Sequence, residues 1–588
     1  MPSNRKIYLA LFILLALSAV VRGFIAGFIE LGNDEVYYWT YAKFPALSHF
    51  DHPPMVGIVI QFFTLNLYLD SEFFLRFASV VLGTLSTGMM FLIGRHIKNP
   101  ITGFYAALLF TASFYGFILS GVFILPDSPQ VFFWLVTLFF LLKSLPDREM
   151  TTESRNFLFY AGVTAGLALL SKYHSVFLVA GTFIYLLLYN RNWFRAKETY
   201  AAFFIFILLF FPVVFWNIEN DFISFTFHEN RVWITESGFQ PQYFLTEIAG
   251  QFFYNNPVNV VIIIVAMIAL IRRKQFLDVS YRRIILWTSV PLFAIFISFS
   301  LFRSTLPHWT GPAYLGFILI AAAWLAEPKR STDSRRKLVP WPVAISLGFL
   351  LFIVVTAIGQ IRYGWISLKR DKIDDVSLDM YGWRQLGEKF APMVKWDEEH
   401  FLIDKGSPIL TFRWFPAANF DYYLGRNINK PVYALGELER IHKYYWINQL
   451  RGDIKKGSDA YYIALSDDYE DPIALYGHLF EMVLPSDTLF ITRGHDTVRM
   501  AFIFRLVDLK QDLIFNREKN PAPRKAEKAD TLSYFLNQIR SDRQYLDLLE
   551  KRSVRLKISL DDLIREEAIK MYQDSKLKLV LPDTNHWK

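Results

Sequence analysis

Long apolar runs constrain the fold of this chain more than any other feature. Up to about residue 360 they alternate with short polar connectors, and beyond that point no run exceeds about ten apolar residues. A membrane-spanning helix needs about 20 mostly apolar residues. The sequence therefore predicts a membrane domain over residues 1–360 and a water-soluble part over residues 361–588.

The apolar runs predict a polytopic α-helical membrane protein with about eleven or more spans. Several runs are shorter than 20 residues, so we expect the helices to extend into the connectors. The first run is too long, and too soon followed by others, to be a cleaved signal peptide. The predicted spans lie near residues 7–29, 74–94, 101–119, 129–142, 157–170, 174–188, 201–217, 256–271, 284–302, 310–326 and 341–360.

Lysine and arginine predict the orientation of these spans, because basic connectors stay on the cytoplasmic side. With a cytoplasmic N-terminus, twenty basic residues fall in cytoplasmic connectors and five in the opposite ones. The apolar run 54–69 then lies at the outer face, within a first outer loop of residues 30–73, since a crossing there would reverse every later connector. Eleven spans also put the C-terminal domain outside.

Composition excludes several other classes of protein. The chain is 53% hydrophobic and 20% charged, against about 45–50% and about 25% in ordinary soluble proteins, which excludes a disordered chain. Because it has no cysteine, it has no disulfide, thiolate zinc site or cysteine nucleophile. The cytoplasmic connectors explain the net charge of +8, so we expect no nucleic-acid partner.

The unusual polar residues collect on the outer side, and ionisable groups at membrane level indicate function. The pair Asp34–Glu35 follows the first span, where a carboxylate is suited to act as general base toward a hydroxyl. Asn33 and Asp34 are alternatively suited to cap a helix. The other ionisable residues of interest are Glu30, His49, Asp51, His52, Asp127, His174, Asp221, His228, Glu229, Arg231, Arg303 and His308.

Cations form a second set of candidates. Arg22 lies inside the first span, Arg76 begins the second, and Lys172 lies in a tight turn. Each is suited to bind a lipid phosphate, arginine through paired hydrogen bonds and lysine as a point charge. Alternatively, Arg76 and Lys172 extend to the lipid headgroups, and Arg22 pairs with a loop carboxylate.

Imidazole and carboxylate side chains in the outer loops are candidate ligands for a divalent metal. They are His49, Asp51, His52 and His308. Their spacing matches no compact metal motif, and two separate loops would have to supply the ligands. A metal is therefore the minority interpretation of these residues.

A series of motifs recurs in order over about the first 320 residues. It comprises Arg22, GNDEVYYW at 32–39, FDHPPM at 50–55, LRFASVVLGTLSTG at 75–88, LPDSPQVFFW at 125–134, KYH at 172–174, FPVVFWNIENDFISFTFHENR at 211–231 and LPHWTGPAY at 306–314. Together these motifs resemble membrane glycosyltransferases of the GT-C fold. The resemblance is to family 39, the protein O-mannosyltransferases, and to bacterial relatives that include the lipid A aminoarabinose transferases.

The resemblance implies transfer of a sugar from a polyprenyl-phosphate donor to an acceptor on the outer membrane face, with inversion at the anomeric carbon. Positive charge near the donor phosphate would stabilise the leaving group. The implied site residues are Asp34 as general base with Glu35 beside it; Arg76, Lys172, Tyr173 and His52 near the donor phosphate; Arg22, Asp127 and Arg231 elsewhere in the cavity; and Asp51 and His308, whose counterparts in the aminoarabinose branch suggest zinc.

The sequence departs from the aminoarabinose branch at two positions. That branch carries a basic residue where this chain has Val36, and tends to have lysine where this chain has His52. Both changes remove permanent positive charge from the expected phosphate site, which argues against transfer of aminoarabinose. The resemblance also implies a bacterial inner membrane. It leaves open the sugar, and whether the acceptor is a protein, a lipid or a glycan.

The C-terminal part is predicted to be a mixed α/β domain over residues 361–520. Strand-like runs occur at 407–412, 460–465 and 498–507, and a helix-like run occurs at 415–424. Residues 521–530 resemble a linker, and residues 531–572 have helical periodicity. This part does not resemble the corresponding domain of eukaryotic O-mannosyltransferases.

Two other functions compete with the glycosyltransferase. A transporter or flippase of lipid-linked sugars would be expected to show repeated halves and interrupted helices with polar groups near the midplane. The sequence shows neither pattern. A membrane scaffold would not explain Asp34–Glu35 together with Lys172, so the enzyme is the preferred interpretation.

Overall fold

The computed structural model describes residues 3–146, 150–232, 238–272, 275–327, 338–366 and 375–515, with residues 540, 550, 559–561 and 564. The linker predicted over 521–530 and nearly all of the helical segment predicted over 531–572 lie outside these residues. The chain divides into two compact units, Met1–Arg384 and Gln385–Lys588.

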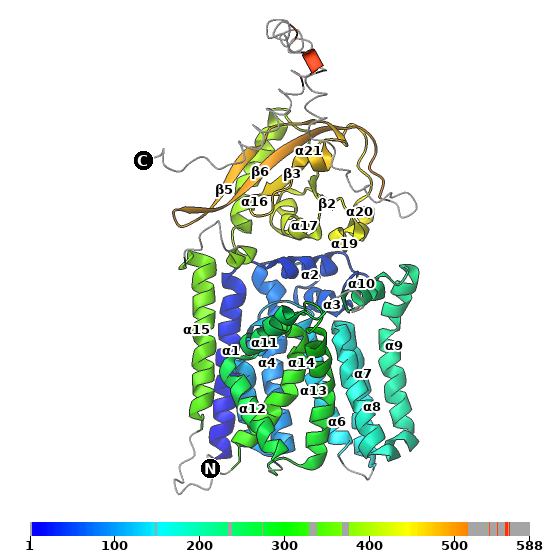
Figure 1. Ribbon diagram of the computed structural model, residues 1–588, viewed down its shortest axis with the longest axis vertical. Helices are drawn as coiled ribbons and strands as arrows, with labels where there is room; N and C mark the ends of the chain where they lie inside the picture. The colour runs from blue at the N-terminus through cyan, green and yellow to red at the C-terminus, as the bar shows by residue number, and fades with distance from the viewer. Residues whose placement is uncertain are drawn as a thin grey trace. The chain divides into compact units, whose positions relative to one another are not determined.

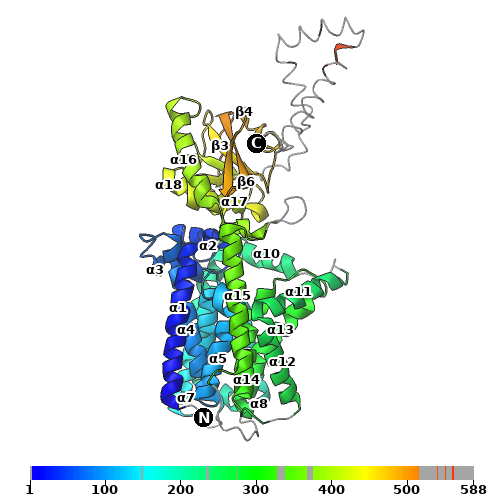
Figure 2. The ribbon, with the colours of Figure 1, turned by 90° about the vertical axis from the view of Figure 1, so that its left-hand side faces the viewer.

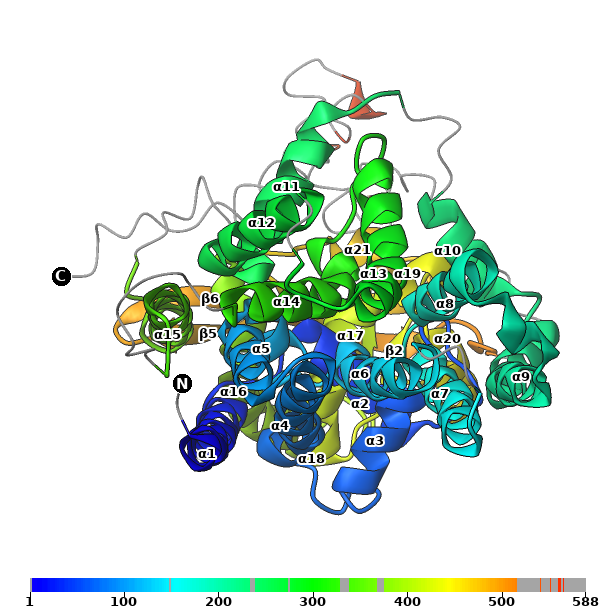
Figure 3. The ribbon, with the colours of Figure 1, turned by 90° about the horizontal axis from the view of Figure 1, so that it is seen from below.

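The first unit is a bundle whose long helices run in roughly the same direction, as Figure 1 and the end-on view of Figure 3 show. Its α-helices are α1 (Asn4–Phe28), α2 (Asn33–Lys43), α3 (Met55–Phe63), α4 (Glu72–Ile97), α5 (Pro100–Ala112), α6 (Asp127–Ser144), α7 (Thr152–Ser171), α8 (Val176–Tyr189), α9 (Lys197–Glu219), α10 (Ile223–Val232), α11 (Pro241–Asn255), α12 (Pro257–Ile271), α13 (Val279–Phe299), α14 (Gly311–Leu325) and α15 (Trp341–Tyr363). Shorter turns of other helix types are η1 (Tyr115–Leu119), η2 (Tyr173–Ser175), η3 (Arg191–Arg195), η4 (Pro307–Thr310) and η5 (Val376–Met380).

The predicted fold class is confirmed. Each of the eleven predicted spans coincides with helix, whereas the ambiguous run 54–69 contains α3, whose 9 residues extend only ~14 Å at ~1.5 Å per residue. Within the described ranges, five helices are long and apolar enough to cross a membrane singly, namely α1, α4, α9, α13 and α15. The pair α11–α12 meets the same test only together, with a bend of 100°. The total number of spans stays a prediction.

The core of the bundle lies around α5 and α14, which are buried along nearly their whole length. α5 packs against α4, and glycine makes the close approach possible: a Cβ on Gly103 would lie 2.3 Å from the carbonyl oxygen of Phe91. At the end of the bundle opposite the N-terminus, α2 and α3 lie across the long helices (Figures 1 and 2). They carry the first outer loop predicted from the sequence.

The second unit is built on a mixed sheet in the order β2-β1-β3-β6-β4, with β5 also paired to β6. β1 is parallel to β2 and β3, and all pairs that involve β6 are antiparallel. The three predicted strands and the predicted helical run are confirmed. The strands are β1 (Ile409–Thr411), β2 (Val432–Ala434), β3 (Ala460–Leu465), β4 (Phe480–Val483), β5 (Asp487–Arg493) and β6 (Asp496–Leu509), and the helices are α16 (Trp383–Glu399), α17 (Trp414–Phe420), η6 (Asp421–Gly425), α18 (Arg426–Ile428), α19 (Leu438–Ile441), α20 (Tyr444–Arg451) and α21 (Pro472–Tyr476).

Candidate active site

The acidic pair predicted from the sequence lies in the first turn of α2. Successive helical side chains point about 100° apart, and here this rotation separates the two carboxylates. Asp34 is exposed, whereas Glu35 is only 2% exposed. Glycine precedes the helix at position 32, where a Cβ would approach Asp379 Oδ2 to 3.0 Å. The two adjacent acids therefore have different environments.

Glu35 is held by hydrogen bonds on both of its oxygens. Arg76 donates from Nε to Oε1 at 2.8 Å and from Nη2 to Oε2 at 2.5 Å. The main-chain N–H groups of Ile124 and Gly32 donate to the same two oxygens, each at 3.0 Å. Four donors from three separate segments converge on this one buried carboxylate.

Arg76 has no N–H group left for another ligand. Besides its two bonds to Glu35, it donates to the carbonyl oxygens of Ala26 at 3.0 Å, Ile29 at 2.7 Å and Glu30 at 2.8 Å. These carbonyls lie at and just beyond the C-terminal end of α1, where intrahelical partners are lacking. All five N–H groups of the guanidinium are thus used. Arg76 is therefore engaged by Glu35 and by the end of α1, and is not held open for the donor phosphate expected from the sequence.

Asp34 lies among other carboxylates. Although its side chain is exposed, protein atoms surround much of the carboxylate, and the resulting desolvation raises its pKa. The negative charges of Asp379, Asp51 and Glu35 add to this effect, while Lys172 opposes it, and the pKa rises to about 7. At neutral pH, Asp34 is therefore poised to accept a proton.

A buried ion pair contributes to the electrostatics of Asp34. Lys172 directly follows α7 and donates from Nζ to Asp127 Oδ2 at 2.7 Å, with both side chains almost fully buried. Tyr115 donates its hydroxyl to the other oxygen of Asp127 at 3.0 Å. One of the three N–H groups of the Lys172 ammonium is therefore used by Asp127, and its positive charge is also felt at Asp34 and His308.

Asp51 and His52 are placed by the aromatic run of α2. Tyr37 and Tyr41 both donate hydroxyl hydrogen bonds to Asp51 Oδ1, at 2.9 and 2.5 Å. His228 Nε2 lies 2.7 Å from the carbonyl oxygen of Asp51. His52 Nδ1 is buried and has no hydrogen-bond partner among the described residues. Desolvation is the main cause that lowers the pKa of His52 to about 3, so this imidazole is neutral at pH 7.

The predicted metal ligands do not fit a metal site. Within the described ranges, no three histidine or acidic side chains are grouped as a metal would require. Asp51 already accepts two tyrosine hydroxyls on one oxygen. The ring of His308 instead lies 6.1 Å from that of Tyr254. Desolvation, followed by the charge of Lys172, lowers the pKa of His308 to about 4.

The remaining predicted cavity residues, Tyr173, Arg22 and Arg231, do not share one environment. Tyr173 packs its ring against His228, with centroids 5.2 Å apart. Arg22 is fully buried within the helices and donates to the carbonyl oxygens of Phe117 and Gly116, each at 3.3 Å. These partners are carbonyl oxygens, not the loop carboxylate of the alternative interpretation of Arg22. The side chain of Arg231 lies outside the described residues.

Two contributors to the site were missed in the sequence. Asp379, on η5, accepts a hydrogen bond from the main-chain N–H of Asn33 at 3.2 Å and raises the pKa of Asp34. Asp379 is distant from Asp34 in the sequence, so no local pattern indicated that the two would be close. Tyr115, which holds Asp127, lies in a predicted span; a tyrosine within an apolar run was the only available sign.

Comparison with known proteins identifies relatives of part of the chain. The family model described as dolichyl-phosphate-mannose-protein mannosyltransferase matches residues 51–216. The lipid A galacturonosyltransferase RgtD of Rhizobium johnstonii is 23% identical over 295 residues, which are 50% of this chain. That match spans only 60% of the relative's own length.

Solved structures extend the likeness to both units. The crystal structure of ArnT from Cupriavidus metallidurans bound to undecaprenyl phosphate matches with a TM-score of 0.54 and 16% identity, over 84% of this chain and 97% of that one. The apo structure of the same protein matches with a TM-score of 0.53 over the same shares. At this level of identity, the likeness shows the fold.

Proposed function

From the GT-C fold that the chain shares with membrane glycosyltransferases, we propose that it transfers a sugar from a polyprenyl-phosphate donor to an acceptor on the outer face of the membrane. RgtD and the matched mannosyltransferase family are sugar transferases by description, and the matched ArnT structure holds undecaprenyl phosphate. The sugar, and the choice among protein, lipid and glycan acceptors, are not part of the proposal.

The observation that carries the proposal is the exposed Asp34 carboxylate, whose pKa is raised to about 7 beside a buried ammonium. In the proposed reaction, a hydroxyl oxygen of the acceptor attacks the anomeric carbon while Asp34 takes the hydroxyl proton. The bond between that carbon and the phosphate oxygen breaks, and polyprenyl phosphate leaves with the electron pair. Attack from the face opposite the phosphate inverts the anomeric carbon.

The cationic role falls to Lys172 in this scheme. Its ammonium has two N–H groups beyond the one given to Asp127, and its charge would stabilise the phosphate as it leaves. His52 and Tyr173 would line the same place, His52 as a neutral hydrogen-bonding group because its pKa is about 3. Arg76 and Glu35 act as positioning residues, since they fix the turn that carries Asp34.

The test is sugar transfer by the purified full-length protein in detergent, with a panel of polyprenyl-phosphate sugars. We expect the wild type to release polyprenyl phosphate from at least one donor, and Asp34→Asn to reduce turnover by at least about a hundredfold, as expected for loss of a general base, without weakening donor binding. Glu72→Gln is the matched control, because that carboxylate lies in an ion pair with Arg384, outside the proposed catalytic and donor-phosphate residues. Full activity of Asp34→Asn would contradict the assignment.

The alternative function is transport of a lipid-linked sugar. Binding of labelled donors and their movement across the bilayer of reconstituted vesicles, with no turnover on a broad panel of donors and acceptors, would favour the transporter and overturn the enzyme.

A further inference from the structure

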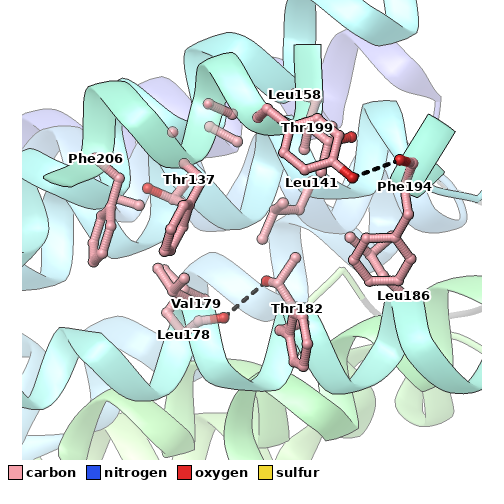
Figure 4. Close-up of a pocket in the computed structure, with 17 residues that line it drawn as sticks. Thr137, Leu141, Leu158, Leu178, Val179, Thr182, Leu186, Phe194, Thr199 and Phe206 are labelled. Carbon is pink, nitrogen blue, oxygen red and sulfur yellow. Dashed lines mark hydrogen bonds between the residues drawn. The ribbon is translucent and has the colours of Figure 1, made fainter. Parts of the chain in front are cut away.

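An apolar pocket of about 460 Å³ lies among α6, α7, α8 and α9, with η3 at one end. Figure 4 shows leucine, valine and phenylalanine side chains from these helices converging on it. Its volume falls within the range of about 300–1,000 Å³ typical of ligand sites. It contains none of the residues assigned to sugar transfer, so it requires a separate explanation.

The polar atoms of the pocket are already satisfied, which defines the chemistry of its ligand. Each threonine or tyrosine hydroxyl on the lining donates to a main-chain carbonyl oxygen, as Figure 4 shows for Thr182. The four pairs are Thr137 to Phe133 at 2.8 Å, Thr182 to Leu178 at 2.8 Å, Thr199 to Trp193 at 2.6 Å and Tyr200 to Phe194 at 2.9 Å. A group that needs hydrogen bonds would gain little here, whereas a hydrocarbon chain would lose nothing.

The pocket opens toward the outer surface of the bundle. Three of its lining side chains are more than half exposed: Phe183 at 54%, Tyr200 at 61% and Phe203 at 56%. They belong to α8 and α9, and α9 is among the helices apolar enough to cross a membrane. The mouth therefore faces the hydrocarbon of the lipid bilayer, and a lipid chain can enter from the side.

Basic side chains cluster at the η3 end of the pocket. Arg191 and Arg195 belong to η3, Lys197 begins α9, and all three are exposed. Phe194, between the two arginines, lines the pocket itself. An apolar pocket that ends beside three cations is complementary to a lipid whose acyl chain joins an anionic headgroup.

We propose that this pocket binds one acyl chain of an anionic phospholipid, whose phosphate lies against Arg191, Arg195 and Lys197. The polyprenyl donor is a poorer fit because its proposed phosphate site is at the other end of α7. Lys172 follows that helix. Arg155, in its first turn, lies beside the basic cluster, because it pairs with Glu198 at the start of α9 at 3.7 Å. The 17 residues between Arg155 and Lys172, at ~1.5 Å each, separate the two ends by ~25 Å. The proposal does not depend on sugar transfer.

The test is lipid binding by the full-length, delipidated protein in detergent, measured by native mass spectrometry. The probes are dioleoylphosphatidylglycerol, dioleoylphosphatidylcholine and undecaprenyl phosphate. Ala165→Phe places an aromatic ring in the pocket. If it displaces two methylenes of the chain, affinity for both phospholipids should fall about fifteenfold. Ala201→Phe is the matched control, because this exposed α9 residue does not line the pocket.

A second variant tests the headgroup without changing the pocket. Replacing Arg191 and Arg195 by glutamine should lower the affinity for phosphatidylglycerol about thirtyfold, at about fivefold per charge, and leave that for phosphatidylcholine unchanged. The proposal is overturned if Ala165→Phe binds phospholipid as well as Ala201→Phe does. It is also overturned if Ala165→Phe weakens only undecaprenyl phosphate, because the pocket would then hold the donor's tail.

Discussion

Replacing Glu35 by glutamine leaves the Arg76 guanidinium without its carboxylate while barely changing the volume of the side chain. Arg76 and Glu35 are 0% and 2% exposed, so water cannot take over the lost contacts. Glu35 also receives two main-chain N–H groups, and an amide NH₂ at this position would face at least one of four donors. Removal of one partner from a buried pair costs about 3–5 kcal/mol.

This cost can be converted into a shift of the melting temperature. Unfolding entropy of about 2.1 cal/mol/K per residue gives ~0.8 kcal/mol/K for the unit Met1–Arg384. A loss of about 3–5 kcal/mol therefore lowers the Tm by about 4–6 °C. Asp34→Asn, one residue away, removes a carboxylate whose raised pKa shows that its charge is unfavourable in the folded protein, so its Tm should equal or exceed that of the wild type.

The assay is thermal unfolding of the purified full-length protein in detergent, followed by intrinsic fluorescence, with turnover measured well below the transition. We expect Glu35→Gln to lose stability but retain measurable activity, and Asp34→Asn to do the opposite. A Glu35→Gln protein that melts with the wild type and is inactive would refute this reasoning, because Glu35 would then act in the chemistry.

Three further predictions concern other groups. Because Asp34 must be unprotonated to act as base and its pKa is about 7, kcat/KM should rise about tenfold per pH unit below pH 7 and level off above it; a flat profile from pH 5 to 8 contradicts this. Lys172→Met, which strands Asp127, should weaken donor binding by at least about tenfold in equilibrium titrations. Asp397→Asn leaves Arg505 paired only with the more exposed Asp487. It should destabilise the second unit by about 1.5–3 kcal/mol, visible as faster hydrogen exchange in β6, and unchanged exchange refutes this.

Most of the fold could be predicted from the sequence because its signals are local. Apolar runs located the long helices, and the run 460–465 located β3. The charge bias also excluded a crossing at 54–69, where the structure has only the short helix α3. The strand order could not be predicted, because β6 pairs with three strands through contacts distant in the sequence.

The sequence indicated many of the residues of the candidate site, but not which groups each of them would contact. Adjacency suggested that Asp34 and Glu35 act together, yet the rotation of α2 exposes one and buries the other. Sequence alone does not tell how a short polar helix is rotated. Likewise, Arg76 was expected at a phosphate, but the carbonyl oxygens that end α1 take three of its N–H groups. Every residue has a main-chain carbonyl oxygen, so the identity of the residues does not reveal which carbonyl oxygens will accept a hydrogen bond from Arg76.

Arg22 has a consequence for how the protein enters the membrane. Its two main-chain acceptors, the carbonyl oxygens of Gly116 and Phe117, are about 95 residues further along the chain. At about 5–20 residues per second of synthesis, α1 leaves the ribosome about 5–20 s before they do. During this interval the guanidinium lacks these two acceptors. Because Arg22 lies in the last two turns of α1, its cost in an isolated apolar helix is below the ~2.5–3.5 kcal/mol of an arginine at the helix centre. Biogenesis of this bundle therefore includes a stage in which α1 is in place but η1, which supplies acceptors for Arg22, has not yet been synthesised.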